Sequence, residues 1–82
     1  MTLDKGCDIR RAGYNEDNVA QLDLKAQDGT FNWNFFYSST DNARVILAVA
    51  LAAITTGKAV ECQVDDPATN SHPGISAIWL VS

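Results

Sequence analysis

The strongest constraint on the fold is an unbroken run of ten apolar residues, Val45 to Ile54. The pair Gly57-Lys58 follows this run, and glycine is typical of the end of a helix. The run predicts one helix of three to four turns, which is shorter than the roughly 20 apolar residues that span a bilayer. We therefore expect no membrane insertion. Before the run stand residues that commonly cap helix starts: Ser38, Ser39, Thr40 and Asp41.

This predicted helix lacks the polar face that a surface helix normally has. The 82 residues make a single domain, 1–82, which has little material to cover such a helix on several sides. We expect one helix face to pack on its own chain and the opposite face to meet a second subunit. The two candidate faces are Ile46, Val49 and Ala53, and Leu47, Leu51 and Ile54.

Alternation of apolar and polar residues predicts strands on both sides of the helix. The clearest alternation lies in residues 19–26 and 31–37, and the Asp28-Gly29 pair between them is a hairpin signal. The remaining predicted strands are 5–11, 59–65 and 75–81. The order strand, strand, strand, helix, strand, strand fits the five-stranded OB-fold barrel, an all-β fold with one helix. The alternative is an open α+β sheet with one packed helix.

The outward residues of the first three strands form a candidate binding surface. If Phe31, Trp33 and Phe35 face the core, Phe36 points outward among polar side chains. Amides and carboxylates suit sugar hydroxyls, and an aromatic ring suits the C–H face of a sugar. The alternative is an ordinary solvated face with Phe36 in a subunit contact. The candidate glycan-binding residues are Asp8, Arg10, Gln21, Asp23, Asn32, Asn34 and Phe36.

The two cysteines, Cys7 and Cys62, fall on the first and fourth predicted strands, which are neighbours in an OB barrel. Both thiols would then point inward. Two interpretations stay open: a disulfide that staples the barrel, or two small buried side chains that never react. The single histidine is distant from both in the sequence, so the pair does not resemble a zinc site.

The charge of the chain and its lack of known catalytic motifs disfavour several classes of function. The net charge is −4 and the six basic residues are scattered, which disfavours nucleic acid as a partner. There is no phosphate loop, nucleophile elbow or zinc-hydrolase motif, so we expect neither catalysis nor a cofactor. No signal peptide is visible, which fits either a cytosolic protein or a mature chain.

The passage from Leu47 to Val60, in which an Ala/Leu-rich helix runs through Thr-Gly-Lys into a strand, resembles the B subunits of AB5 toxins. The resemblance is to B subunits of the subtilase-cytotoxin and pertussis-like (typhoid toxin) type. The closing segment Ile75–Leu80 is similar to their last strand. The resemblance covers roughly the C-terminal half of the chain. The serine-centred sialic-acid motif of the family is missing from the first strand, where Cys7 and Asp8 stand.

The resemblance implies an OB-fold that forms a ring-shaped homopentamer, binds host glycans on its outer surface and holds the tail of an A-type subunit. It adds Ile78 and Leu80 of the last strand to the candidate interface, and it implies a secreted or periplasmic location. The expected function is a non-catalytic oligomeric binding subunit. The alternatives are a structural homo-oligomer without a ligand and an OB domain that binds single-stranded nucleic acid.

Overall fold

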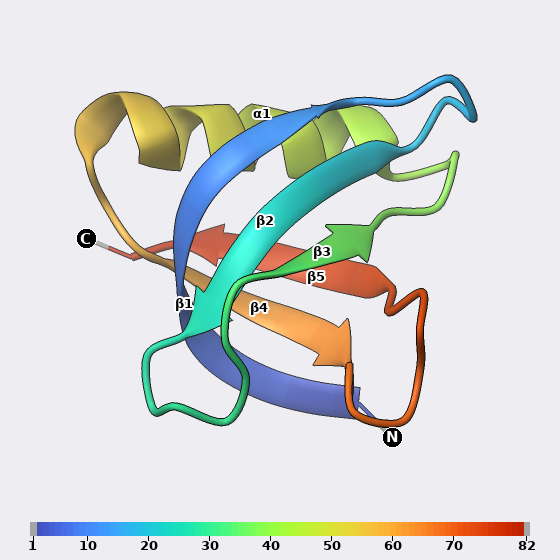
Figure 1. Ribbon diagram of the computed structural model, residues 1–82. Coiled ribbons are helices and arrows are strands. Elements are labelled where there is room, and N and C mark those ends of the chain that lie inside the picture. Colours follow the sequence, from blue (N-terminus) through green and yellow to red (C-terminus); the bar gives the residue numbers. More distant parts are fainter. Residues whose placement is uncertain (1, 82) are drawn as a thin grey trace.

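The computed structural model describes residues 2–81, which form one sheet and one helix (Figure 1). The sheet has the strand order β3-β2-β1-β4-β5, and all neighbouring strands are antiparallel. The protein is therefore mostly sheet with one helix, as the sequence predicts. The elements in chain order are β1 (Thr2–Tyr14), β2 (Ala20–Ala26), β3 (Asn34–Tyr37), α1 (Ala43–Thr56), β4 (Val60–Asp65) and β5 (Ile75–Leu80).

Strand β1 joins the two halves of the sheet. Its first half, Thr2–Cys7, pairs with β4, and its second half, from Cys7 onward, pairs with β2. Cys7 is the one residue that pairs on both sides, with Ala26 of β2 and with Val60 of β4. Figure 1 shows β1 as a long curved band, so the sheet curls around an interior.

The two edge strands, β3 and β5, approach each other where the sheet curls. They are joined by one isolated parallel bridge between Tyr37 and Gly74. Next to it, the Tyr37 N–H donates a hydrogen bond of 3.0 Å to the Pro73 carbonyl. No continuous ladder joins β3 to β5 within residues 2–81, so the sheet is curled but not closed.

The core lies between the inner face of the sheet and the helix. Alternation in β2 works as predicted, because Ala20, Leu22 and Leu24 are all fully buried. Aliphatic and aromatic side chains from four strands meet there with small residues of the helix. The other buried apolar residues are Cys7, Ala26, Phe31, Phe36, Ala43, Ile46, Ala50, Ala53, Val60, Cys62, Val64 and Ile75.

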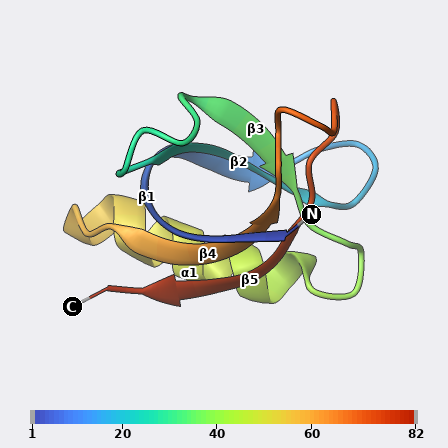
Figure 2. The same cartoon turned by 90° about the horizontal axis from the view of Figure 1, so that it is seen from below.

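Helix α1 packs against β1, β2 and β5, and Figures 1 and 2 show it lying across one side of the curled sheet. Its buried residues are mostly alanines, which allow close approach to the sheet: Ala43, Ile46, Ala50 and Ala53. The predicted face Ile46, Val49 and Ala53 is therefore the one that packs on its own chain, with Val49 half-buried. The helix ends at Gly57, which has a left-handed φ of 71° that glycine adopts without a Cβ penalty.

The orientation predicted for the third strand is wrong. Strand β3 begins at Asn34 rather than at residue 31, and Phe36 is fully buried. Trp33, Phe35 and Tyr37 are only half-buried, so the aromatic residues predicted to face the core lie outside it. Phe31 is buried, but it reaches the core from the connection before β3. Those connecting residues interrupt the strand alternation. Phe31 and Phe36 can therefore both face the interior, although one has an odd and the other an even residue number.

Candidate functional site

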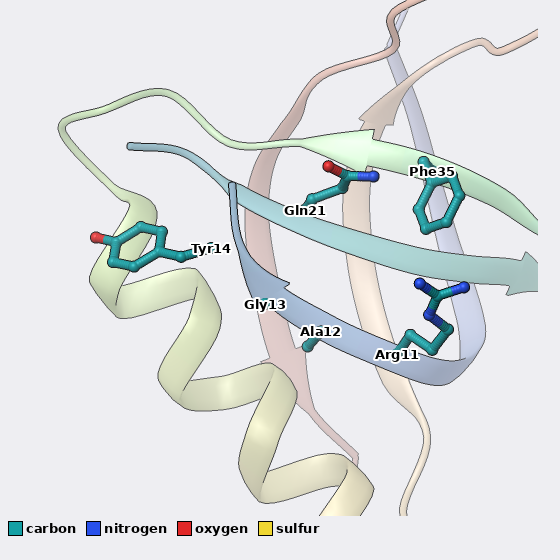
Figure 3. Close-up of a pocket in the computed structure, with 6 residues that line it drawn as sticks. All are labelled: Arg11, Ala12, Gly13, Tyr14, Gln21 and Phe35. Atoms are coloured by element: carbon teal, nitrogen blue, oxygen red, sulfur yellow. The ribbon is translucent and has the colours of Figure 1, made fainter. Parts of the chain in front are cut away.

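The outer face of β1, β2 and β3 carries a hollow of about 200 Å³. We call it the outer hollow. Figure 3 shows Arg11, Gln21 and Phe35 close together on one side of it, while Tyr14 points away from them. It therefore combines a cation, an amide and aromatic rings. Its lining residues are Arg11, Ala12, Gly13, Tyr14, Gln21 and Phe35.

A β-bulge in β1 brings two arginines to this face. Ile9 pairs with Leu24 and Arg11 pairs with Asp23, so Arg10 is the extra residue between two consecutive pairs. In a regular strand, neighbouring side chains point to opposite faces. A bulge removes that constraint and re-aims side chains. As a result both Arg10 and Arg11 are exposed.

Arg10 is held by two partners. Its Nε donates to Asp23 Oδ2 at 2.6 Å, and its guanidinium carbon lies 4.3 Å from the centroid of the Trp33 ring. The side chain of Asp23 is only 4% exposed, whereas that of Arg10 is 53% exposed. Arg10 thus covers a buried carboxylate and compensates its charge, which makes the charged pair tolerable on a sheet face.

Arg11 is placed differently. Its guanidinium carbon lies 5.4 Å from the centroid of the Phe35 ring, a cation–π contact. Across residues 2–81 the Arg11 side chain makes no ion pair and no hydrogen bond, which leaves its donors available in the outer hollow. Arg11, Asp23 and Phe35 lie in one row across the three strands, because Asp23 is the register partner of both. The Arg10 side chain is therefore occupied by contacts within the fold, whereas the Arg11 side chain faces the outer hollow.

The structure brings together only some of the predicted site residues. Arg10 and Asp23 form the ion pair beside the outer hollow, and Gln21 lines the hollow. Asp8 is exposed and accepts a hydrogen bond of 3.1 Å from Gln27 Nε2. The prediction for Phe36 is wrong, because its side chain is fully buried in the core and cannot reach a ligand.

The two predicted asparagines serve the local backbone. Asn32 Oδ1 accepts from the Trp33 N–H at 2.9 Å, and Asn34 Oδ1 accepts from the Phe35 N–H at 3.1 Å. Neither residue lines the outer hollow. The sequence reasoning missed Arg11, Tyr14 and Phe35. The consecutive pair Arg10-Arg11 inside a predicted strand was the one available signal, since a regular strand would bury one of them.

A second hollow, of about 380 Å³, lies where β3 and β5 approach each other. Its polar groups are used within the fold. Asp65 Oδ2 accepts from the Gly74 N–H at 2.9 Å, and Ser38 Oγ accepts from the Ala20 N–H at 2.8 Å. The His72 and Tyr37 rings stack with centroids 4.2 Å apart on the same seam. We therefore assign this region to the fold rather than to a ligand.

The helix and the end of β5 expose large apolar side chains. On α1, Val45 is 68%, Leu51 46% and Ile54 38% exposed. The Val81 N–H donates to the Ala59 carbonyl at 3.1 Å, so the end of β5 lies next to the turn that follows the helix. We call these residues the apolar rim: Val45, Leu51, Ile54, Trp79, Leu80 and Val81.

The apolar rim contains three of the eight residues of the predicted oligomer interface. Leu51, Ile54 and Leu80 are exposed, as a contact between chains requires. Leu47 and Ile78 are half-buried against their own core. Ile46 and Ala53 are buried on the inner face of α1, which makes them unavailable to a second subunit.

Residues 2–81 contain no cluster of three or more histidine, cysteine or acidic side chains arranged to hold a metal ion. None of the helical structure in that range is both long enough and apolar enough to cross a bilayer. Cys7 and Cys62 are both buried free thiols.

Comparison with protein-family models, with curated proteins and with solved structures finds no significant match to this chain. We therefore infer the function from the outer hollow, the apolar rim and the arrangement of the strands.

Proposed function

We propose that the curled sheet is a small OB-fold barrel that closes between β3 and β5. The order β3-β2-β1-β4-β5 leaves these two strands at the edges, and the bridge between Tyr37 and Gly74 joins them in the parallel sense. The helix between the third and fourth strands also agrees with this fold. These features support the barrel over a flat open sheet.

On this fold, the protein acts as a non-catalytic binding subunit that recognises a glycan in the outer hollow. The observation that carries the proposal is the Arg11 guanidinium, which lies against Phe35 beside Gln21 with no partner of its own among the described residues. An aromatic ring offers a surface for the C–H face of a sugar. The guanidinium and the amide offer directed donors for hydroxyl or acidic groups.

The subunit assembles as a ring-shaped homo-oligomer, which we propose to be a pentamer. The support is the apolar rim, because large apolar side chains of α1 and of the end of β5 remain exposed to solvent in a single chain. The resemblance of residues 47–60 to AB5 toxin B subunits favours the ring. Burial of one such leucine or isoleucine contributes roughly 1.5–3 kcal/mol, so a few per interface stabilise an assembly.

A glycan array with the purified protein tests the binding proposal. We expect a signal from a defined set of sugars that Arg11→Ala abolishes. The matched control is Lys25→Ala, which removes the same charge from an exposed position of β2 outside the hollow. No signal from the wild-type protein, or equal signals from both variants, would contradict a glycan site in the outer hollow.

Light scattering on the same sample tests the assembly. A pentamer has five times the chain mass of 8.9 kDa. An oligomer that shows no glycan signal would instead favour a structural scaffold subunit. A band retarded on single-stranded DNA at low salt would favour the nucleic-acid alternative, in which Trp33 and Phe35 stack on bases.

A further inference from the structure

The two cysteines lie next to each other inside the sheet. Cys7 of β1 pairs with Val60 of β4, and Cys62 of β4 pairs with Lys5 of β1. They are therefore diagonal neighbours on adjacent antiparallel strands, offset by two residues. Side chains two residues apart on a strand share a face, and both cysteines are fully buried on the inner one.

The strand register fixes the surroundings of both thiols. The Cys7 thiol donates to the Lys5 carbonyl at 3.6 Å, and Lys5 is the register partner of Cys62. Hydrogen bonding with Cys7, followed by burial, raises the pKa of the Cys62 thiol. The register and the burial together place the two thiols on adjacent strands of one sheet face.

The position of the pair matters for the fold. Cys7 is the residue at which β1 passes from β4 to β2, since it pairs with both strands. A covalent bond from Cys7 to Cys62 would tie β4 to this junction. It would also close a loop of roughly 55 residues, which restricts the unfolded chain.

We propose that Cys7 and Cys62 form one intrachain disulfide when the chain folds in the presence of a thiol–disulfide oxidant such as oxidised glutathione. A cysteine thiolate attacks the oxidant disulfide and releases one glutathione thiol. The second cysteine thiolate then attacks the mixed disulfide and releases the other glutathione. Two cysteine thiols are oxidised to one S–S bond, and one oxidant disulfide is reduced to two thiols, so electrons and protons balance.

The geometry also determines when the bond forms. Both thiols are shielded from solvent in the folded protein, so the oxidant reaches them before β1 has docked on β4. A diagonal pair spans a greater Cα–Cα distance than a directly opposed pair, so β1 and β4 must draw slightly together as the bond closes.

The test is to refold the reduced, denatured full-length chain in glutathione redox buffer and, in parallel, in excess reductant. We expect the first sample to lose both titratable thiols, to lose the mass of two hydrogen atoms and to remain a single chain on a non-reducing gel. Its thermal midpoint should rise by on the order of 10 °C over the reduced sample. Cys62→Ser should abolish all of these changes.

Two free thiols in the protein refolded with oxidant would overturn the proposal, as would thiol loss that occurs only through disulfides between chains. The comparison of the two wild-type samples decides the matter even where Cys62→Ser does not fold. A negative result leaves the glycan and ring proposals untouched, because neither of them depends on the cysteines.

Discussion

Arg10 and Asp23 form an unequal ion pair, in which a half-exposed guanidinium lies 2.6 Å from an almost completely buried carboxylate. The inequality arises because Arg10 bends over the sheet face and also packs on Trp33. Removal of Arg10 and removal of Asp23 therefore have different consequences. Without Arg10, the carboxylate loses the group that covers it, whereas without Asp23 the arginine remains in water.

We therefore expect Arg10→Ala to lower the free energy of unfolding by about 1–3 kcal/mol. Asp23→Ala should cost less, because the freed guanidinium is already half solvated. Urea denaturation of both single variants and the double variant gives the coupling between the two side chains. If the free-energy losses of the two single variants add up to the loss of the double variant within about 0.5 kcal/mol, the two side chains are not energetically coupled.

Phe35 and Phe36 are neighbours in β3 with opposite environments. Phe36 is fully buried, whereas Phe35 lies on the outer face against Arg11. We expect Phe36→Ala to lower the free energy of unfolding by about 3–5 kcal/mol. Phe35→Ala should cost about 1 kcal/mol or less and should instead weaken ligand binding.

Denaturant titration of the two phenylalanine variants checks this order directly. Each variant is the control of the other, since both remove the same side chain from adjacent positions of one strand. A larger stability loss for Phe35→Ala would mean that β3 has the opposite orientation.

Leu51 and Ala53 separate self-association from folding. Leu51 is 46% exposed on α1, and Ala53 is fully buried against the sheet. Leu51→Glu should reduce the solution mass to that of one chain and leave the circular dichroism spectrum unchanged. Ala53→Glu should unfold the protein, because it buries a carboxylate without a partner.

Light scattering and circular dichroism on both helix variants provide the readout. If Leu51→Glu and Ile54→Glu each keep the wild-type mass, the exposed side of α1 is not a subunit contact. The ring proposal would then lose its main support.

Asp28 makes stability depend on acid. Lys5 Nζ lies 2.8 Å from Asp28 Oδ2, and Thr30 donates to the other carboxylate oxygen. The hydrogen bond from Lys5, followed by those from Thr30, holds the pKa of Asp28 below its ordinary value of 3.8. Because the folded state has the lower pKa, ionised Asp28 stabilises it. The contribution is fully present above pH 3.8 and is lost as the pH falls below that value.

Thermal melts of the wild-type protein and Asp28→Asn check the pH dependence. We expect the variant to melt at a lower temperature at about pH 6, and the difference between the two proteins to shrink progressively as the pH falls below 3.8. The difference at neutral pH should be small and should shrink with added salt, because the pair lies at the surface. If the difference in melting temperature instead grew on acidification, the pKa of Asp28 would be raised rather than lowered in the folded state.

The sequence patterns were sufficient for most elements and for the interior of β2. The alternation of Ala20, Leu22 and Leu24 predicts their burial, and the apolar run predicts α1, although it leaves open which of the two helix faces packs on the chain. These patterns succeed because a buried face imposes a strict spacing on a strand or a helix. Val45, Leu51 and Ile54 remain exposed on this chain, so the coverage of the outer helix face by a second subunit stays a prediction.

The outer hollow was harder to foresee. Two adjacent phenylalanines, Phe35 and Phe36, fit either orientation of β3, so alternation cannot choose between them. The connection before β3 decides the matter, because the Phe31 carbonyl accepts from the Ala26 N–H at 3.1 Å and brings the Phe31 ring inward. The bulge at Arg10 is a property of the pairing between β1 and β2, so the consecutive pair Arg10-Arg11 hints at it but cannot fix its position.

The single bridge between Tyr37 and Gly74 makes the seam between β3 and β5 the weakest line in the sheet. Its two sides are far apart in the chain, so they meet only after both hairpins have formed, and loop closure makes such contacts late and costly. Amide protons along this seam should exchange with solvent earlier than those of β1. The molecule is therefore expected to open first along the edge between β3 and β5, while the long central strand β1 stays paired with both of its neighbours.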